Sequence, residues 1–410
     1  MIRPAQQAFG KARDRLRLVT LRLKWGSKLE IHRKFSSAQN GSSACAPQHY
    51  RPPEEAPPVG NHGPALIESG LLKLTAPRSP GIFVIVAGCL LGGCRAPAPS
   101  LSPAPPRYTL QTSGVWQLNL PEGQRFDASG LLLTPQGELL TVSDRGPSIY
   151  RIEFSTNAAA ADLARLPDCF TEAQLAPFAA EKHDRYDCEG MAQDSAGRLY
   201  LCEEADRWIL RFDPVTHRVT RLEIDWTPVR KYFDPFDHDA SFEGIAIDNE
   251  TLYVANERQR GRLIAVDLQT LKVIDDFVVR PRRGGFVDLL TGGDVHYSDL
   301  CWRDGSLYAL LRENRVILKI DPAKHQVLAE YDYGAVENAP DVLYHRIYPF
   351  VGVMEGLAVD RDCFWLVTDN NGLGRVRRPE DTRPTLFRCP RPDAAPSRAG
   401  VTSRVSDSGR

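Results

Sequence analysis

The sequence predicts an all-β fold, a β-propeller of five four-stranded antiparallel blades, with a sixth blade left open. One pattern of short apolar strands occurs five times between residues 126 and 378. Equivalent positions in successive copies lie 54 to 60 residues apart, a spacing typical of propeller blades. Turn residues such as 135–137 and 303–305 separate the strands as hairpins require. An open solenoid or a sandwich array is the less favoured alternative.

The elements of each copy follow one order. The first strand starts at a polar residue followed by Gly or a small apolar residue, and the second strand ends at another polar residue. A third strand follows, and a fourth is predicted at 218–224, 272–279 and 326–331 but is weak in the first copy. Residues 115–120 precede the first copy, and we expect them to close the ring by pairing near 385–389. One helix, 171–181, is expected to decorate a loop.

Composition excludes two classes of protein. The 410 residues carry 51 Lys and Arg against 52 Asp and Glu, a formal net charge of -1, which argues against a nucleic-acid binder. No apolar run reaches the roughly 18–20 residues of a membrane-spanning helix, which argues against a polytopic membrane protein. We expect a monomer without a nucleic-acid partner.

The segments around the repeats are predicted to lie outside the propeller, which we place at 112–390. Residues 1–70 are first basic and then rich in Ser, Pro, Gly and Ala, so we expect disorder there, as in the tail 391–410. Residues 71–94 combine basic residues, an apolar run and small residues, as a secretory signal does. A signal so far along the chain indicates that residues 1–70 are a mis-assigned extension.

The end of that signal, 91–94, resembles the lipobox of bacterial lipoproteins. The resemblance implies that Cys94 is lipidated and that 95–111 is a Pro-rich tether. The protein would then be exported and held in the periplasm or at the outer membrane, touching the membrane only through its lipid. A buried apolar strand at 82–91 is the alternative.

Six cysteines fall within the predicted propeller, 112–390: Cys169, Cys188, Cys202, Cys301, Cys363 and Cys389. None forms a CxxC pair, so a zinc ribbon and a thioredoxin-like motif are absent. If the domain is exported, one disulfide is possible, with Cys169–Cys188 and Cys363–Cys389 as the candidate pairs. Cys202 and Cys301 are expected to be buried thiols.

Two columns of polar residues carry the chemistry of the repeats. The starts of the first strands form one column: Ser129, Glu189, Glu243, Asp299 and Glu355. The ends of the second strands form the other: Asp144, Glu204, Glu257, Arg312 and Asp369. Antiparallel pairing sets the start of one strand beside the end of the next, so both columns gather on one rim of the central channel.

Eight of these ten residues are acids, which repel one another unless a cation binds or some carboxyls stay protonated. Carboxylates from several strands suit Ca²⁺, which takes six to eight oxygen ligands. We therefore predict the eight acids as metal ligands and Ca²⁺ as the cofactor, with Arg312 supplying positive charge in the fourth copy. The alternative is that the acids cap blade hydrogen bonds beside a water-filled channel.

Histidines and an arginine lie close to the same columns. His183, His238 and His296 come three to six residues before an inner strand, and His183 and His238 are our candidates for a general base. Arg145 is the candidate for holding an anionic group of a ligand. Surface histidines without a role are the alternative.

The runs Ser-Asp-Arg-Gly at 143–146 and Asp-Cys-Glu-Gly at 187–190, with the repeated Glu-Gly strand starts, resemble the phytase-like propeller family, described as "esterase-like activity of phytase". The resemblance covers about 115–390. It implies an exported bacterial propeller, sometimes lipid-anchored, whose rim acids bind a divalent metal. Ser129 and Arg312 depart from that pattern.

Two functions follow. One is a metal-dependent hydrolase of phosphate or carboxylic esters, with a small anionic or ester ligand at the rim. The other is a non-catalytic cell-envelope propeller that binds a ligand or a protein. The chain has no GxSxG elbow, P-loop, GxGxxG after a strand or HExxH, so other common hydrolase and nucleotide-binding classes lack support.

Overall fold

The structure, a computed structural model, describes residues 104–119, 123–155, 159–183, 185–233, 241–257, 261–282, 295–348 and 351–394. The predictions for 1–70, for the signal and for Cys94 lie outside these residues. So do the predictions for most of the tether and the tail.

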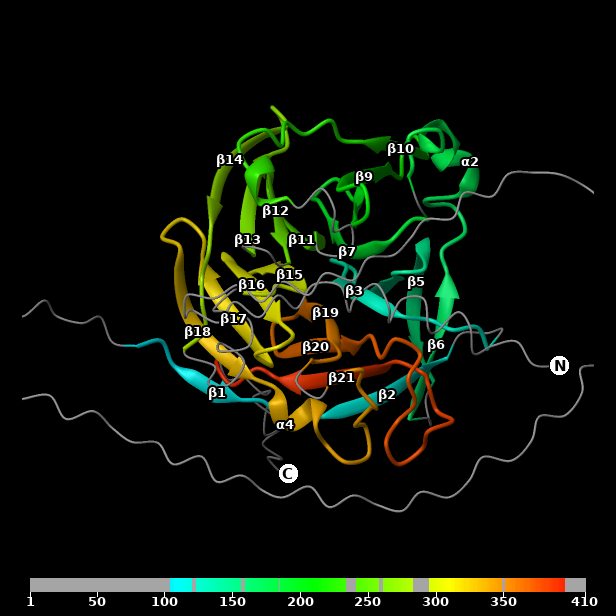
Figure 1. The fold of residues 1–410 in the computed structure, drawn as a ribbon, viewed down its shortest axis with the longest axis vertical. Coiled ribbons are helices and arrows are strands. Elements are labelled where there is room, and N and C mark those ends of the chain that lie inside the picture. Colours follow the sequence, from blue (N-terminus) through cyan, green and yellow to red (C-terminus); the bar gives the residue numbers. More distant parts are fainter. Residues whose placement is uncertain are drawn as a thin grey trace, which may run out of the picture. The chain divides into compact units, whose positions relative to one another are not determined.

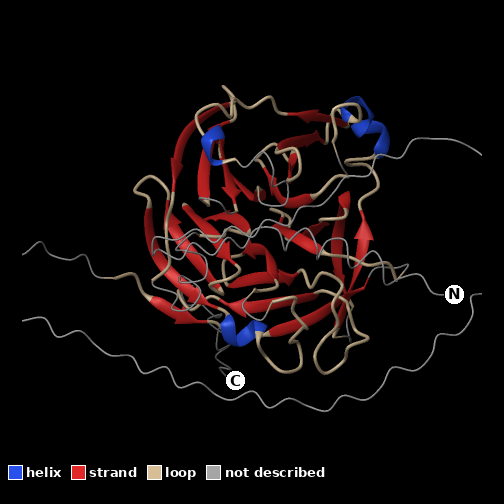
Figure 2. Cartoon of the chain, in the orientation of Figure 1, coloured by secondary structure: helices blue, strands red, loops and turns tan. Residues whose placement is uncertain are grey.

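Strands dominate the described part. Its helical segments are short: α2 (Glu172–Leu175), η1 (Ala176–Phe178), η2 (Arg230–Tyr232) and α4 (Gly334–Glu337). They lie at the periphery of the strands (Figure 2). Thr171 caps α2 through a capping box with Gln174, so the predicted helix at 171–181 begins as expected but is shorter.

The described strands form four sheets, which divide into five blades of four antiparallel strands because parallel pairing of β2 with β6 joins blades 5 and 1 in one eight-stranded sheet. Blade 1 is β3 (Ala128–Leu133), β4 (Leu139–Ser143), β5 (Gly146–Phe154) and β6 (Ala160–Arg165). Blade 2 is β7 (Cys188–Gln193), β8 (Leu199–Glu203), β9 (Trp208–Asp213) and β10 (Arg218–Arg221). Blade 3 is β11 (Phe242–Asp248), β12 (Thr251–Asn256), β13 (Arg262–Asp267) and β14 (Lys272–Phe277).

The last two blades each use an N-terminal strand. Blade 4 is β15 (Asp299–Arg303), β16 (Ser306–Leu311), β17 (Val316–Asp321) and β18 (Gln326–Asp332), with β1 (Arg107–Thr109) added in parallel at its outer edge. Blade 5 is β19 (Met354–Val359), β20 (Cys363–Thr368), β21 (Thr385–Pro390) and β2 (Gly114–Asn119). The antiparallel pairing of β2 with β21 confirms the predicted closure strand.

The first strands of the five blades make a closed ring. β3 contacts β7, β7 contacts β11, β11 contacts β15, β15 contacts β19, and β19 contacts β3. Figure 1 shows these strands near the centre of the view, with β10, β14 and β18 farther out. The described residues therefore form five blades, which settles the number that the sequence left open.

Glycine permits the close approach of the inner strands. A Cβ built on Gly190 would lie 2.7 Å from the Cα of Gly244, and one on Gly244 would lie 2.4 Å from the Cα of Asp299. Side chains do not fit at such separations, so the Gly of each Glu-Gly pair is a requirement of the ring.

Five apolar clusters lie between neighbouring blades, one at each junction. Both faces of a blade are therefore covered, which explains why strands such as β16 are buried along their whole length. The six cysteines of the described region are free thiols, so neither candidate disulfide forms. Among the described residues no helix is long and apolar enough to cross a membrane.

Candidate functional site

The first polar column lies at β-bulges in four of the blades. In blade 2, Cys188 pairs with Glu203 and Gly190 pairs with Cys202, so Glu189 is the extra residue of the bulged strand. The equivalent residues of blades 1, 3 and 5 are Ser129, Glu243 and Glu355. A bulge turns a side chain out of the regular alternation of the strand, and here it acts at the start of each inner strand.

A repeated backbone hydrogen bond sets the second column beside the first. The N–H of Glu204 donates to the carbonyl of Asp187 at 2.8 Å, and the N–H of Glu257 donates to the carbonyl of Ser241 at 2.8 Å. Asp144 and Asp369 make the same bond, to the carbonyls two residues before the bulge in their own blades. Both columns thus lie on one rim, as the sequence predicted.

Two clusters of three carboxylates result, each joining neighbouring blades. Asp144 of blade 1 meets Asp187 and Glu189 of blade 2, with ligand atoms all within 4.8 Å of one another. Glu204 of blade 2 meets Glu243 and Glu257 of blade 3 within the same limit. We call them the Asp144 cluster and the Glu204 cluster; Asp187 was not among the predicted ligands.

Burial and mutual repulsion raise the pKa of several rim acids. Desolvation is the largest cause at Glu189, followed by the charges of Asp187 and Glu243. Desolvation also raises the pKa of Glu243 and of Asp369, with neighbouring carboxylates adding to it. Buried carboxyls that repel one another in this way are neutralised by a proton or by a bound cation.

Arg312 gives blade 4 a different electrostatic role. Its guanidinium lies 2.5 Å from Glu257 Oε1 and 3.1 Å from Glu313 Oε1, and it also pairs with Glu355. The arginine is buried, with 6% of its surface exposed. It supplies positive charge between blades 3 and 5, as predicted from the break in the acidic column.

Asp299 is placed differently from the sequence prediction. It has no bulge: Asp299 pairs with Leu310 in regular register. Its carboxylate accepts backbone hydrogen bonds from Leu357 at 2.7 Å and Leu300 at 2.8 Å, and a longer one from Leu131. Burial raises the pKa of Asp299, while these N–H groups act to lower it. The residue caps inner strands and is removed from our set of metal ligands.

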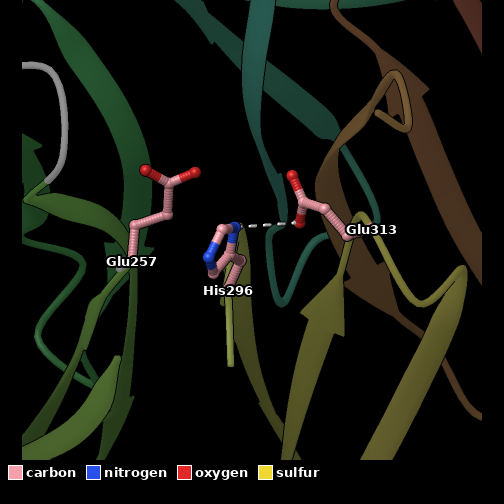
Figure 3. A group of neighbouring side chains, drawn as sticks. All are labelled: Glu257, His296 and Glu313. Carbon is pink, nitrogen blue, oxygen red and sulfur yellow. Dashed lines mark ion pairs between the residues drawn. The ribbon is translucent and has the colours of Figure 1, made fainter. Parts of the chain in front are cut away.

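The structure describes two of the three histidines and places them apart. His183 is 82% exposed at its side chain, and its Nδ1 lies 2.6 Å from Asp206 Oδ1. His238 lies outside the described residues. His296 lies between Glu257 and Glu313, which the sequence did not indicate as its partners (Figure 3).

Arg145 has an arginine neighbour that sequence reasoning missed. Arg125 Nη2 lies 2.7 Å from Asp127 Oδ2, and Arg145 Nη1 lies 3.5 Å from the same oxygen. Asp127 is fully buried, whereas both arginine side chains remain partly exposed. Asp127 and Asp187 occupy the same position, two residues before the bulge, and that internal repeat was the signal available in the sequence.

Solved structures provide distant likenesses. Glutaminyl cyclase of Myxococcus xanthus matches with a TM-score of 0.46 and 16% identity, over 70% of this chain and 97% of that chain. A catalytically inactive virginiamycin B lyase of Staphylococcus aureus, solved with quinupristin, matches with a TM-score of 0.34 and 10% identity, over 64% and 66%. A luciferin-regenerating enzyme matches with a TM-score of 0.35 and 13% identity, over 64% and 77%.

No curated protein matches the chain significantly. A family model does: the phytase-like model, described as "esterase-like activity of phytase", matches residues 126–372. The match runs from the start of blade 1 to the turn after β20 and includes both carboxylate clusters. It spans more than half of the 410 residues, and the chain therefore belongs to the phytase-like propeller family.

Proposed function

We propose that the protein is a divalent-metal-dependent hydrolase of phosphate or carboxylic esters that acts at the acidic rim. The Asp144 and Glu204 clusters carry this proposal, because each brings three carboxylates from two blades within 4.8 Å. Carboxylate oxygens are the donors that Ca²⁺ prefers, and oxygens from several strands suit its flexible coordination. A metal ion bound there would polarise the ester and lower the pKa of a water molecule bound to the ion.

The chain's own residues would orient the substrate. Arg125 and Arg145 both contact Asp127 and keep part of their side chains exposed, so their remaining N–H donors are available to an anionic group. Guanidinium groups bind phosphate and carboxylate through paired N–H donors. An anionic ester is therefore the substrate class that suits this part of the rim. His183, exposed and paired with Asp206, stays the proposed general base, together with His238.

A second candidate function is favoured by one observation. Arg312 and backbone N–H groups already engage Glu257, Glu355 and Asp299, so part of the acidic ring is satisfied within the protein itself. Such a rim would suit a propeller that binds a ligand or a protein without chemistry. For either function we propose the cell envelope as the location, with Cys94 as the lipidated residue.

In the first experiment the full chain is treated with a chelator and then titrated with Ca²⁺. The melting temperature of the protein is measured at each calcium concentration. Selective binding to the folded state raises that temperature in a saturable way. Glu189→Gln and Glu243→Gln should each reduce the rise, and Glu153→Gln, at an exposed position, should not. Hydrolysis of p-nitrophenyl phosphate and p-nitrophenyl acetate is then measured with and without Ca²⁺.

The outcomes separate the two functions. A rise in melting temperature together with calcium-dependent turnover supports the hydrolase. A rise without turnover of either ester favours the binding propeller. A flat titration contradicts the calcium site.

A further inference from the structure

We infer that Glu257, His296 and Glu313 form a second kind of rim site, for a first-row transition-metal ion such as Zn²⁺ or Co²⁺, which shares Glu257 with the Glu204 cluster. The site goes beyond the proposed function, which needs only the two carboxylate clusters. Glu257 follows β12 in blade 3, whereas His296 and Glu313 flank the first two strands of blade 4. The three residues therefore bridge two blades at the rim.

The geometry suits a metal better than a hydrogen bond. The ligand atoms of the three side chains all lie within 4.8 Å of one another. His296 Nδ1 is 3.6 Å from Glu313 Oε2, which is longer than a normal N–H···O bond. Around a tetrahedral ion with bonds of about 2.0–2.2 Å, neighbouring ligands lie about 3.4 Å apart. Figure 3 shows the two carboxylates on either side of the imidazole.

The second observation is the state of Glu313. The residue is 7% exposed, and within the described part of the chain its Oε2 accepts no hydrogen bond. Its Oε1 accepts from Arg312 at 3.1 Å, so the carboxylate is held with Oε2 toward His296.

Arg312 holds the carboxylates of the candidate site in place. Its guanidinium pairs with Glu257 and Glu313, and it also pairs with Glu355 of blade 5. Arg312 contacts the Oε1 atoms of Glu257 and Glu313, and such contacts from outside a site fix the orientation of ligating carboxylates.

The histidine decides the class of metal. Imidazole suits Zn²⁺, Cu²⁺, Fe²⁺ and Ni²⁺, whereas Ca²⁺ prefers oxygen ligands alone. The two carboxylate clusters contain no nitrogen ligand. The rim thus offers two kinds of site side by side, with Glu257 belonging to both.

The test is titration of the metal-free full chain with Co²⁺, whose visible absorption reports its ligands. We expect one Co²⁺ bound with a nitrogen–oxygen spectrum. His296→Gln and Glu313→Gln should each weaken binding by more than about 100-fold, because losing even a residue that orients a ligand costs about 10- to 100-fold. His325→Gln is the matched control, since His325 pairs with Asp275 on an exposed surface.

Several results would overturn the site: no tight Co²⁺ binding, equal binding by His296→Gln, or displacement of Co²⁺ by excess Ca²⁺. If His296→Gln fails to fold, histidine side-chain NMR of the wild type decides, because Zn²⁺ must then shift the signals of one partly exposed imidazole, that of His296. The calcium titration of His296→Gln is run in parallel. Its calcium-dependent rise in melting temperature should persist, so the calcium proposal and this one can fail independently.

Discussion

The backbone N–H of Leu357 in β19 donates a 2.7 Å hydrogen bond to Oδ2 of Asp299 in β15. The N–H of Leu131 in β3 lies 3.5 Å from the same oxygen, and Leu300 donates to Oδ1. One buried carboxylate therefore connects the inner strands of blades 4, 5 and 1. Asp299, which the sequence predicted as a metal ligand, instead links the inner strands that close the ring.

Asp299→Ala should strongly destabilise the propeller. The substitution leaves buried N–H groups without their acceptor, at about 1–3 kcal/mol each, so we expect the free energy of unfolding to fall by about 3–5 kcal/mol. Asp299→Asn retains one acceptor oxygen and should lose less. Urea unfolding measures both, with Asp341→Ala as a control at a side chain that is 84% exposed. A stable Asp299→Ala protein that has lost calcium binding would return Asp299 to the metal ligands.

Gly244→Ala tests the packing of the inner strands. The new Cβ would meet the Asp299 backbone at 2.4 Å, so β11 and β15 must separate. We expect a loss of at least about 3 kcal/mol in the free energy of unfolding, the upper range for overpacking. Gly137→Ala is the comparison: it has φ +84 but open space around it, so backbone strain alone should cost about 1–2 kcal/mol. Equal losses would contradict a packing role for Gly244.

The repeated features of this protein were predictable from sequence. The strand order within each blade and the position of the polar columns follow from a pattern that recurs in each copy, and the closure by β2 was also predicted. The Glu-Gly pair was informative for two physical reasons at once. The Glu is the extra residue of a bulge, and the Gly admits the neighbouring strand.

Features that occur in only one copy of the repeat were not predictable from the sequence. Blade 4 lacks the bulge and the glycine, so Asp299 turns inward and Arg312 reaches carboxylates of two other blades. The partners of His296 depend on how blades 3 and 4 meet, which no local pattern encodes. Arg125 was missed because it precedes the first copy and has no counterpart in the others.

Arg312→Met should cost about 3–5 kcal/mol, because it leaves Glu257, Glu313 and Glu355 as buried carboxylates without their shared cation. Adding Glu355→Gln should recover part of the loss, since one of the three charges is then removed. Thermal and urea unfolding of the single and double variants measure the coupling. Strictly additive losses would show that the pair does not interact.

Leu118→Ala tests the closure strand. Leu118 of β2 is 1% exposed and belongs to the apolar cluster between blades 1 and 5. We expect a loss of about 2–5 kcal/mol, as for other buried leucines. Val215→Ala, at a residue that is 85% exposed, should stay within about 0.5 kcal/mol. A small effect at Leu118 would mean that the ring holds without β2.

The metal-free protein should become more stable as the pH falls from about pH 8 to about pH 5. Glu189, Glu243, Asp299 and Asp369 have pKa values raised by folding, so the folded state binds protons that the unfolded chain does not. Their contribution is present at low pH and is lost as the pH rises through the folded-state values. The pKa of Glu313 is lowered instead, and its contribution disappears only below about pH 4.3, its unfolded value.

Urea midpoints across that pH range, with chelator and with Ca²⁺, measure this dependence. Calcium should flatten it, because the ion binds the ionised carboxylates and removes the advantage of protonation. The double variant Glu189→Gln and Glu243→Gln should also flatten it, without any metal, since amides do not titrate. Stability that instead rises with pH in the metal-free protein would show that these carboxylates are neutralised within the protein, and the case for a cation at the rim would lose its electrostatic basis.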